Sequence, residues 1–380
     1  MQLVLNEDQT MLARTAREFV ASTAPMSRLR KLRDGGDPLR YSPEVWRKLA
    51  ELGWIGIPFA EADGGLGLGL ADVVVVTEAL GRLLAPEPLV ASAILAGSCI
   101  AAAGTPEQKQ RLLPPLIEGS SRLALAHEEH GARADLSFVR ARAERTPSGF
   151  RLTGAKTPVL GGYGAEALLV VARTSGGDRD PEGLTLFEVS RETKGLGLEP
   201  LYRVDSLNAA TLKLQGVEVS ESALIGEIGK ALPLLEGAVD RATVALSGEM
   251  LGGMSEAFER TLVYLREREQ FGAKIGSFQA LQHRAARLFI EIELSRSAVL
   301  AASRAVDESL ASARELVSVA KARCSDAFVL IANEAIQMHG GIGMTDEHDI
   351  GFFLKRAKTA ELTFGDAAFH RARLSRLRGF

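Results

Sequence analysis

Apolar side chains recur at helical spacing on both sides of a short charged segment that runs from Leu265 to Gln279. Upstream of it, one apolar face is formed by Val244, Leu251, Met254, Phe258, Leu262 and Leu265. Downstream, a second apolar face is formed by Leu281, Ala285, Leu288 and Ile292. Residues at such spacing lie on one side of a helix, so both stretches are predicted to be long helices with one buried face. Gly272 and Gly276 predict a corner that joins these helices in antiparallel fashion.

The period of the pattern changes twice along the chain. It is helical up to about residue 120, alternates from about Leu123, and becomes helical again after Gly229. The runs LLVVA at 168–172 and LTLFEV at 184–189 are bounded by turn residues, as strands are. Helix, strand and helix in this order, without βαβ alternation, exclude a Rossmann domain. We therefore expect a small antiparallel β domain between two helical parts, with boundaries at 1–121, 122–227 and 228–380.

Local signals mark helix starts and one glycine-rich turn. Asn6 suits the N-cap of the first helix, and Thr105 followed by Pro106 marks another helix start. Helices are expected at about 70–84, 87–103 and 106–118. The segment PFAEADGGLGLG at 58–69 lacks the lysine of a phosphate-binding loop and follows no βαβ strand. We interpret it as a loop that packs against the next part of the chain.

Composition and charge narrow the class of protein. The chain has 380 residues, of which 46% are hydrophobic, and this suffices for two or three cooperating cores. The net charge of −3 argues against a protein that binds nucleic acid. The basic end HRARLSRLRGF at 370–380 has no interleaved aromatic residues for bases, so a solvated face or a subunit contact is the better interpretation.

Cysteines, histidines and the longest apolar runs give no sign of a metal site, an anchor or export. Cys99 and Cys324 have no metal-binding spacing and suit a reducing compartment. His283 and His339 lack partners at metal-ligand spacing, so no metal is expected. The N-terminus lacks the features of a signal peptide, and no uncharged apolar run reaches roughly 18 residues. A cytoplasmic protein without membrane contact is therefore expected.

The corner between the two long helices carries side chains that suit a phosphate-bearing ligand. Arg268 can form a forked pair with a phosphate, and Gln270 or Gln279 can bind an amide or a ring nitrogen. A second run, QMHGGIG at 337–343, contains glycines whose backbone amides can approach a phosphate closely. The alternatives are a solvated helix corner at the first position and a helix C-cap at the second.

The two motifs together resemble a known family. The segment RxQFGxxIxxFQxxxH, which begins at Arg268, and the run QMHGGIG are similar in order and separation to the signatures of acyl-CoA dehydrogenases, flavoproteins that desaturate acyl thioesters. The resemblance covers essentially the whole chain. It implies an α+β multidomain fold with an N-terminal helical domain, a middle antiparallel β-barrel and a C-terminal four-helix bundle.

The resemblance also implies which residues contact FAD. Arg268 corresponds to the arginine that meets the pyrophosphate of the FAD in a neighbouring subunit, and Gln337 corresponds to the family's flavin-contacting glutamine. Gln279 corresponds to a position nearer the adenine. The expected cofactor contacts are Arg268, Gln270, Phe271, Gln279, Gln337, Gly340, Gly341 and Gly343.

The middle domain departs from the family pattern. The family run T-E-P-x-A-G-S-D corresponds here to EEHGARAD, Glu128 to Asp135, and the run W-I-T corresponds to Thr157 to Leu160 without an aromatic residue. Two hydroxyls that would bind flavin are therefore missing. Arg133 either supplies a charge where the serine is lost or points to solvent.

The catalytic base also departs from the usual position. Desaturation needs a carboxylate that removes the α-proton while the β-hydride goes to FAD N5, and burial raises the proton affinity of that carboxylate. Phe364 stands where most of the family has a glutamate. The isovaleryl-CoA type places its glutamate at the start of the long helix before an arginine, which corresponds to Asp240 and Arg241. Asp240 is therefore the predicted base and Arg241 a predicted substrate contact, with Glu361 and Asp366 as less favoured candidates.

Two functions follow. The first is FAD-dependent α,β-desaturation of an acyl-CoA thioester with Asp240 as base. The alternative is a catalytically weak or silent subunit that completes the FAD site of a partner acyl-CoA dehydrogenase, and Asp240 is then an ordinary helix-start carboxylate.

The resemblance extends to the partners of the chain. The turn from Phe364 to Asp366 and the altered β-domain motifs look like the small subunits of pimeloyl-CoA and steroid side-chain dehydrogenases. This implies a homotetramer or an α2β2 tetramer with a larger subunit. It also implies a dicarboxylic, branched or ring-bearing acyl-CoA, and electron-transfer flavoprotein or a similar acceptor.

Overall fold

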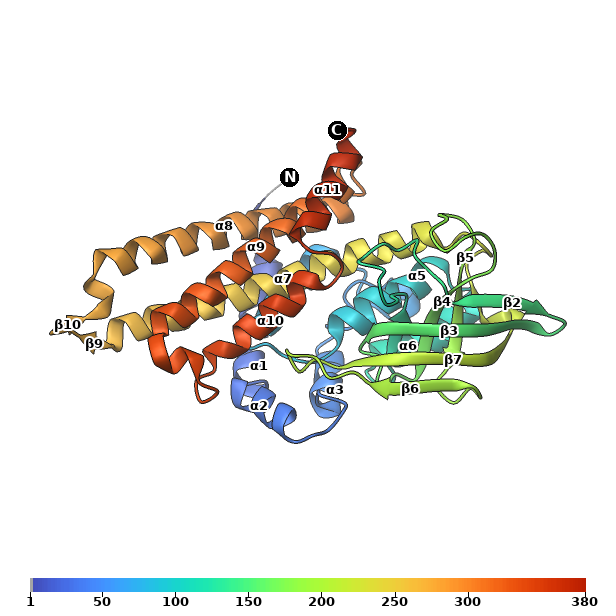
Figure 1. Ribbon diagram of the computed structural model, residues 1–380, viewed down its shortest axis with the longest axis horizontal. Helices are drawn as coiled ribbons and strands as arrows, with labels where there is room; N and C mark the ends of the chain where they lie inside the picture. Colours follow the sequence, from blue (N-terminus) through green and yellow to red (C-terminus); the bar gives the residue numbers. More distant parts are fainter. Residues whose placement is uncertain (1–2) are drawn as a thin grey trace. The chain divides into compact units, whose positions relative to one another are not determined.

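The computed structural model describes residues 3–380. The chain forms helices up to Ile117, strands from Leu123 to Ile225 and helices again from Ala231, which confirms the predicted order of elements (Figure 1). The N-terminal helices are α1 (Glu7–Thr23), α2 (Met26–Asp34), α3 (Pro43–Glu51), α4 (Leu70–Arg82), α5 (Ser98–Ala103) and α6 (Pro106–Ile117). A π-helical segment, Leu89–Gly97, precedes α5.

The predicted helix caps are present. The Asn6 side chain accepts a hydrogen bond of 2.7 Å from the Gln9 backbone N–H and thereby caps α1. Thr105 caps α6 in the same way through the N–H of Gln108. Each cap satisfies one of the backbone donors that a helix start leaves unpaired.

The internal contacts of the chain divide it into two compact units. The first unit contains the chain up to Lys31, Gly69–Ala85 and Thr243–Phe380, and the second contains Leu32–Leu68 and Pro86–Ala242. The long helix α7 (Ala231–Glu267) contributes to both units. The three-domain boundaries remain a proposal, because these units divide the N-terminal helices between them.

The second unit is built on one open sheet. Its strands are β1 (Leu123–Ala126), β2 (Arg142–Thr146), β3 (Gly149–Leu160), β4 (Ala167–Arg173), β5 (Leu184–Ser190), β6 (Leu196–Pro200), β7 (Ala209–Ser220) and β8 (Leu224–Ile225). The strand order is β6-β7-β3-β2-β4-β5-β8, with β1 beside β4. Within residues 3–380 the end strands β6 and β8 do not pair, so the predicted closed β-barrel is wrong. Closure needs a ladder along both end strands, and β8 has only two residues.

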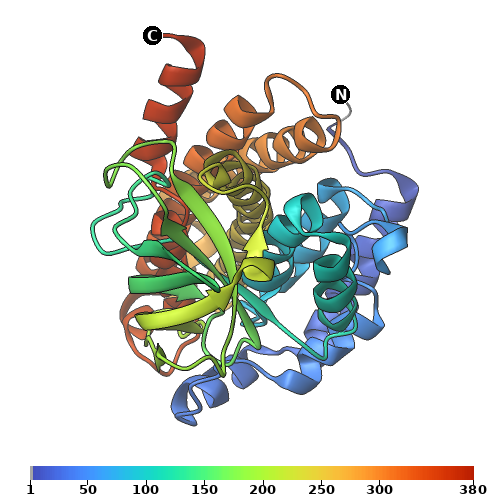
Figure 2. The same ribbon diagram turned by 90° about the vertical axis from the view of Figure 1, so that its right-hand side faces the viewer.

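The sheet is also not wholly antiparallel, because β1 and β2 run parallel to β4. All seven residues of β4 are buried, as expected for a strand inside a sheet that is covered on both faces. The π-helical segment lies against β1, where the Ser92 hydroxyl accepts a hydrogen bond of 2.9 Å from the Leu123 backbone N–H. Figure 2 shows the helices of this unit beside the sheet.

The first unit is helical. The C-terminal helices that follow α7 are α8 (Gln279–Asp307), α9 (Ala313–His339), α10 (Ile350–Leu362) and α11 (Ala367–Arg378). The four-helix bundle predicted from the sequence is therefore extended by a fifth helix. The predicted apolar faces of α7 and α8 are largely buried, with Val244, Met254 and Leu288 at most 3% exposed. No helix within residues 3–380 is long and apolar enough to cross a membrane.

Helices α4 and α7 cross at unusually close range in the first unit. A Cβ atom placed on Gly81 would lie 2.1 Å from the Glu249 carbonyl oxygen, and one on Gly252 would lie 1.9 Å from that of Glu78. The crossing therefore requires glycine on both helices, because no side chain fits at that separation.

Candidate functional site

The predicted corner that carries Arg268 is a β-hairpin. Strands β9 (Glu269–Gln270) and β10 (Ala273–Lys274) pair directly after α7. Phe271 and Gly272 form the turn and both have positive φ, 56° and 77°. A two-residue hairpin with positive φ at both turn positions matches the right-handed twist of its strands.

The hairpin leaves its predicted cofactor contacts facing outward. Phe271 is 94% exposed. Arg268 is exposed as well, and no group within residues 3–380 accepts a hydrogen bond from its guanidinium. The Gln270 side-chain amide donates to the neighbouring Glu269 carbonyl oxygen, 2.6 Å away. The unpaired guanidinium suits a ligand or a partner chain, since arginine forms forked pairs with phosphate and carboxylate groups.

The second predicted motif is a tight turn at the end of α9. Gly340 and Gly341 begin a 3-10 segment, Gly340–Met344, and a Cβ atom on either of these two glycines would meet no atom within 4 Å. Their backbone is therefore open to an approaching group. Gly343 differs, because a Cβ atom there would lie 2.8 Å from the Ile336 carbonyl oxygen. Gly343 is thus required for packing, whereas Gly340 and Gly341 form the open part of the turn.

Both motifs lie at one end of the first unit. The ring of Tyr264 at the end of α7 stacks on His339 at the end of α9, with 4.5 Å between the ring centroids. His339 Nδ1 donates to the Ala335 carbonyl oxygen at 2.7 Å, and burial lowers the pKa of this histidine. His339 is therefore a neutral packing residue that joins the two helix ends. Arg268, Gln270, Gln279 and Gln337 are all exposed around this junction.

This end of the molecule fits the diphosphate and adenosine part of FAD. It offers the unpaired guanidinium of Arg268, two open glycines and three amide side chains, which are donors suited to phosphate and to a base. Within residues 3–380, no group of three or more histidines, cysteines or carboxylates is placed to hold a metal ion.

The loop that would meet the flavin ring lies in the second unit and begins with Glu128. Burial raises the pKa of Glu128 to about 7, and the nearby Arg203 opposes this shift. The His127 ring lies 3.7 Å from the Glu128 carboxylate, and burial lowers the pKa of His127 to about 4. Both groups therefore favour their neutral forms near pH 5 to 7, in the region where the family has a hydroxyl.

Glu129, the next residue, has a structural role. Its carboxylate accepts hydrogen bonds from the backbone N–H groups of Arg140 and Ala141, at 2.9 and 3.0 Å. It also accepts a bond of 2.8 Å from Lys156 Nζ, and both of these side chains are buried. Burial alone would raise the pKa of Glu129, but Lys156 and the two amides hold it below its usual range. Glu129 thus anchors the start of the loop to the sheet.

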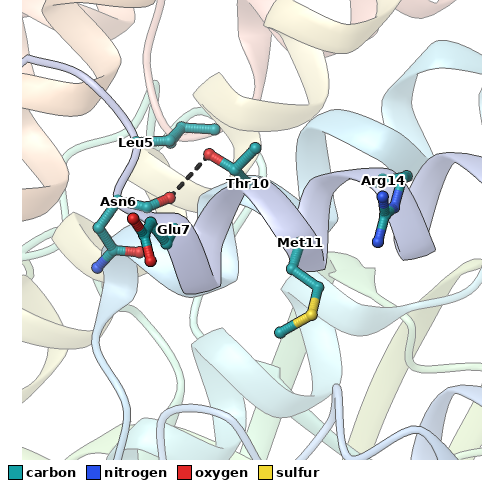
Figure 3. Close-up of a pocket in the computed structure, with 6 residues that line it drawn as sticks. All are labelled: Leu5, Asn6, Glu7, Thr10, Met11 and Arg14. Atoms are coloured by element: carbon teal, nitrogen blue, oxygen red, sulfur yellow. Dashed lines mark hydrogen bonds between the residues drawn. The ribbon is translucent and has the colours of Figure 1, made fainter.

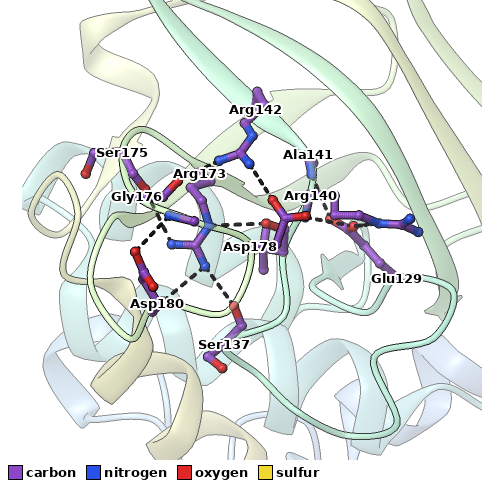
Figure 4. A network of polar contacts seen from close by, with 12 residues as sticks. Glu129, Ser137, Arg140, Ala141, Arg142, Arg173, Ser175, Gly176, Asp178 and Asp180 are labelled. Atoms are coloured by element: carbon purple, nitrogen blue, oxygen red, sulfur yellow. Dashed lines mark hydrogen bonds and ion pairs between the residues drawn. The ribbon is translucent and has the colours of Figure 1, made fainter.

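The far end of the same loop is held by Arg173, which is 1% exposed (Figure 4). Its guanidinium donates to the carbonyl oxygens of Ser137, Val139, Asp180 and Glu182, at 2.7 to 3.1 Å. Arg133 inside the loop is exposed, so it points to solvent and does not replace the lost serine as a buried charge. The loop is therefore fixed by contacts within the second unit.

The ring half of an FAD site is poorly matched by these residues. Glu128 presents a carboxyl group in place of a hydroxyl. The Thr157 hydroxyl is already paired with that of Thr211, 3.2 Å away, and Pro158 follows it without an aromatic residue. The chain thus fits the dinucleotide arm of FAD well and its isoalloxazine ring poorly.

Among the candidate bases Asp240, Glu361 and Asp366, Asp240 is the most buried. It lies on α7 and is 8% exposed, and Arg241 beside it is half-buried. Glu361 pairs with Lys358 at 3.0 Å, and Asp366 caps α11 by accepting from the Phe369 N–H at 2.8 Å.

The usual position of the base is occupied by Phe364, which is 3% exposed. Asp240 and Arg268 are not brought together within one chain. A helix rises about 1.5 Å per residue, so α7 keeps Asp240 about 40 Å from the end that carries Arg268.

A surface pocket of about 390 Å³ lies elsewhere, along the start of α1 (Figure 3). Its lining residues are Leu5, Asn6, Glu7, Thr10, Met11 and Arg14. None of the predicted site residues contributes to it, so it is not part of the candidate site.

Nothing in the motifs singles out Lys321 or His370, two buried titratable residues of the first unit. Lys321 lies on the same buried stripe of α9 as Val317, Cys324 and Phe328. A lysine on an apolar helix stripe is the signal that could have found it, because lysine is rarely buried completely.

Comparison with known proteins matches both helical parts of the chain to one family. The family model described as "Acyl-CoA dehydrogenase, N-terminal domain" matches residues 6–120, and "Acyl-CoA dehydrogenase, C-terminal domain" matches residues 233–377. The mitochondrial isovaleryl-CoA dehydrogenase of Bos taurus is 30% identical over 387 aligned positions, which cover 98% of this chain and 88% of that protein.

Solved structures agree over the full length. The Tcur3481-Tcur3483 steroid ACAD is 33% identical, with a TM-score of 0.86 and 98% of each chain covered. The ChsE4-ChsE5 complex from Mycobacterium tuberculosis contains a chain that is 28% identical, with a TM-score of 0.89, and the match covers 100% of this chain and 99% of that one.

Proposed function

The chain belongs to the acyl-CoA dehydrogenase family of FAD-dependent oxidoreductases, and we propose that Asp240 is the base with which it desaturates an acyl-CoA thioester. The observation that carries this proposal is the burial of Asp240, which is 8% exposed, whereas Glu361 and Asp366 are only partly buried. Phe364 at the usual position cannot accept a proton. The similarity to an isovaleryl-CoA dehydrogenase supports a base on the long helix.

The chemistry asked of Asp240 is removal of a weakly acidic proton from the carbon next to the thioester carbonyl. Arg241, the next residue, places a cation near the carboxylate and the thioester end. Bound FAD supplies the hydride acceptor for the β-carbon.

Substitution of Asp240 by Asn tests the proposal. General-base catalysis contributes about 10²- to 10⁴-fold, so we expect the Asp240→Asn variant to lose flavin bleaching by an acyl-CoA panel to that extent. Glu236→Gln removes a charge one turn earlier on the same helix and is expected to keep wild-type activity. Retention of activity by Asp240→Asn, with FAD bound, would show that another group is the base.

A second function is favoured by the poor match at the flavin ring. In this case Arg268 and the turn at Gly340 and Gly341 bind the FAD of a larger partner subunit, and the β domain of this chain binds no flavin ring. The carboxyl group of Glu128 and the proline at position 158 support this possibility. The purified chain would then retain no FAD alone, but would raise the FAD content of its partner.

We also propose the class of partner and substrate. Two similar structures carry the names of two proteins each, the ChsE4-ChsE5 complex and Tcur3481-Tcur3483. These paired names support an α2β2 tetramer for this chain. A steroid ACAD and an isovaleryl-CoA dehydrogenase among the similar proteins support a branched or ring-bearing acyl-CoA. Electron-transfer flavoprotein or a similar carrier would accept the electrons, in the cytoplasm. Purification from native cells would identify any second polypeptide.

A further inference from the structure

Three unusual features meet at one turn of the first unit, between α10 and α11. Phe364 is a bulky residue with a φ of 60°, and Gly365 follows with a φ of 99°. Lys321 is 0% exposed and has no ion-pair partner within residues 3–380. His370 is 2% exposed. Unfavourable backbone angles and buried charges persist only where the surroundings fix them, and they gather at functional sites.

The Lys321 ammonium binds both sides of this turn. Its Nζ donates to the Glu361 carbonyl oxygen at 2.9 Å and to the Gly365 carbonyl oxygen at 2.8 Å. The third bond goes to the Ser325 hydroxyl at 3.0 Å. An ammonium has three N–H donors, so a protonated Lys321 is fully satisfied by these acceptors. The carbonyl of Glu361 belongs to the last turn of α10, where the negative end of the helix dipole favours a cation.

His370 fixes the residue between them. Its Nε2 lies 3.0 Å from the Phe364 carbonyl oxygen. A carbonyl only accepts, so the ring proton is on Nε2, and Nδ1 is buried without a partner. Burial and the nearby Lys321 lower the pKa of His370 to about 3, which keeps this neutral tautomer at working pH.

We propose that Lys321 and His370 are positioning residues that hold Phe364 as part of the acyl-CoA site. Phe364 then acts as an aromatic wall whose place is set by its backbone, not by side-chain packing alone. This inference rests on the proposed desaturase function, because its rate measurements need turnover of an acyl-CoA. The structural claim, that Lys321 and His370 fix the backbone of this turn, can be tested without any substrate.

The hold depends on the charge of Lys321. Burial lowers the pKa of Lys321 to about 8. The charged or titratable groups around it are Cys324 on α9, Glu361 on α10, and Asp366, His370 and Arg373 on α11. A neutral amine has only two N–H donors, so deprotonation leaves one of the three acceptors without its bond. Turnover is therefore expected to fall as pH rises through about 8.

This alkaline loss differs from unfolding. The pKa of Lys321 is lower in the fold, at about 8, than its ordinary value of 10.5. Between these values the unfolded chain keeps the proton that the folded chain has lost, so Lys321 makes the fold more stable as pH rises. A fall in turnover over the same pH range would therefore reflect a change in the position of Phe364 and not unfolding caused by Lys321.

Amide hydrogen exchange of the segment 359–370 tests the hold directly. In the wild type, local opening of this segment has to break the hydrogen bonds of Lys321. Lys321→Met lacks these bonds, so opening costs less free energy, and we expect exchange at pH 7 to be about tenfold faster or more. Lys358→Met removes an exposed lysine from α10, beside the measured segment, and is expected to leave exchange unchanged. His370→Gln keeps an N–H donor and is expected to hold the turn, whereas His370→Leu is expected to loosen it.

Turnover of an acyl-CoA substrate provides the second measurement. A displacement of about 1 Å costs on the order of 100-fold in rate, so kcat of Lys321→Met is expected to fall by up to that factor, with a smaller change in KM. Lys321→Arg keeps the charge at all pH values and is expected to retain turnover without the alkaline fall.

The outcomes separate this inference from the proposed function. Unchanged exchange in Lys321→Met, or an alkaline fall that persists in Lys321→Arg, would overturn the positioning role. If wild-type protein turned over no acyl-CoA, the proposed function would fail. Hydrogen exchange alone would then show whether Lys321 fixes the turn between α10 and α11. Faster exchange in Lys321→Met would support this role, and unchanged exchange would refute it.

Discussion

At the scale of single residues, Glu128 and Glu129 show how neighbours with the same side chain acquire opposite properties. Glu129 accepts bonds from two amides and one ammonium, and its pKa lies below the usual range. Glu128 is partly buried without such donors, and loss of solvent raises its pKa to about 7. In the sequence the two residues are simply adjacent glutamates. Only the surrounding structure shows that Glu129 anchors the loop and that Glu128 has a raised pKa.

Glu128 is expected to make the fold less stable as pH rises. From its ordinary pKa of 4.5 up to about 7, the unfolded chain releases a proton that the folded chain keeps. Each pKa unit is worth about 1.4 kcal/mol, so Glu128→Gln should raise the free energy of unfolding by about 1–3 kcal/mol at pH 8, and much less at pH 4. Urea unfolding at both pH values measures this.

Glu129→Gln serves as the comparison. Its pKa is lowered in the fold, so its charge stabilises the protein above the ordinary pKa, and we expect this variant to be less stable than wild type at pH 8. A difference between Glu128→Gln and wild type that did not change with pH would contradict the raised pKa.

At the scale of elements, the helical period predicted the long helices well, since one buried face is a local property of the sequence. The predicted barrel failed for a non-local reason. Whether β6 and β8 meet depends on strand lengths and on the parallel pairing of β1 with β4, which alternation alone does not encode. The hairpin after α7 was also missed, because Phe271 is an unusual residue for a turn position with positive φ.

The crossing of α4 and α7 gives an element-scale prediction. Gly252→Ala would place a Cβ atom 1.9 Å from the Glu78 carbonyl oxygen, so the helices must separate. Overpacking costs typically about 1–3 kcal/mol, and we expect a loss of about 3 kcal/mol in the free energy of unfolding. Gly237→Ala, on the same helix with no atom within 4 Å of the added Cβ, should be neutral or slightly stabilising. Chemical denaturation that ranked the two variants alike would contradict the close crossing.

At the scale of the whole molecule, the residues expected to hold the cofactor arm remain a prediction, and the structure adds which of them are open. Gly343 looks equivalent to Gly340 and Gly341 in the motif, yet it is required for packing. The separation of Asp240 from Arg268 on α7 is likewise invisible in a motif list. If both residues serve one site, as we propose, that site draws on two chains.

Mixing two inactive variants tests this division. If the protein is a symmetric homo-oligomer, Asp240→Asn and Arg268→Ala chains should each be inactive, the second through loss of FAD. Refolded together, they should recover about a quarter of wild-type activity, because half of the pairs contain one intact site out of two. Flavin absorbance and turnover of the mixture provide the measurement. Absence of recovery, with proven mixing, would indicate that a different subunit supplies the rest of the site.

The hairpin with Phe271 at its tip has a consequence for how much of this protein a cell keeps. An aromatic ring that is 94% exposed at the hairpin tip can be covered by a partner chain, and binding would stabilise the folded chain by mass action and so reduce its degradation. Copies that find no companion would be cleared first. The abundance of the chain is therefore expected to follow the supply of the protein that covers its tip, and changing the dosage of one gene should change the lifetime of the other's product.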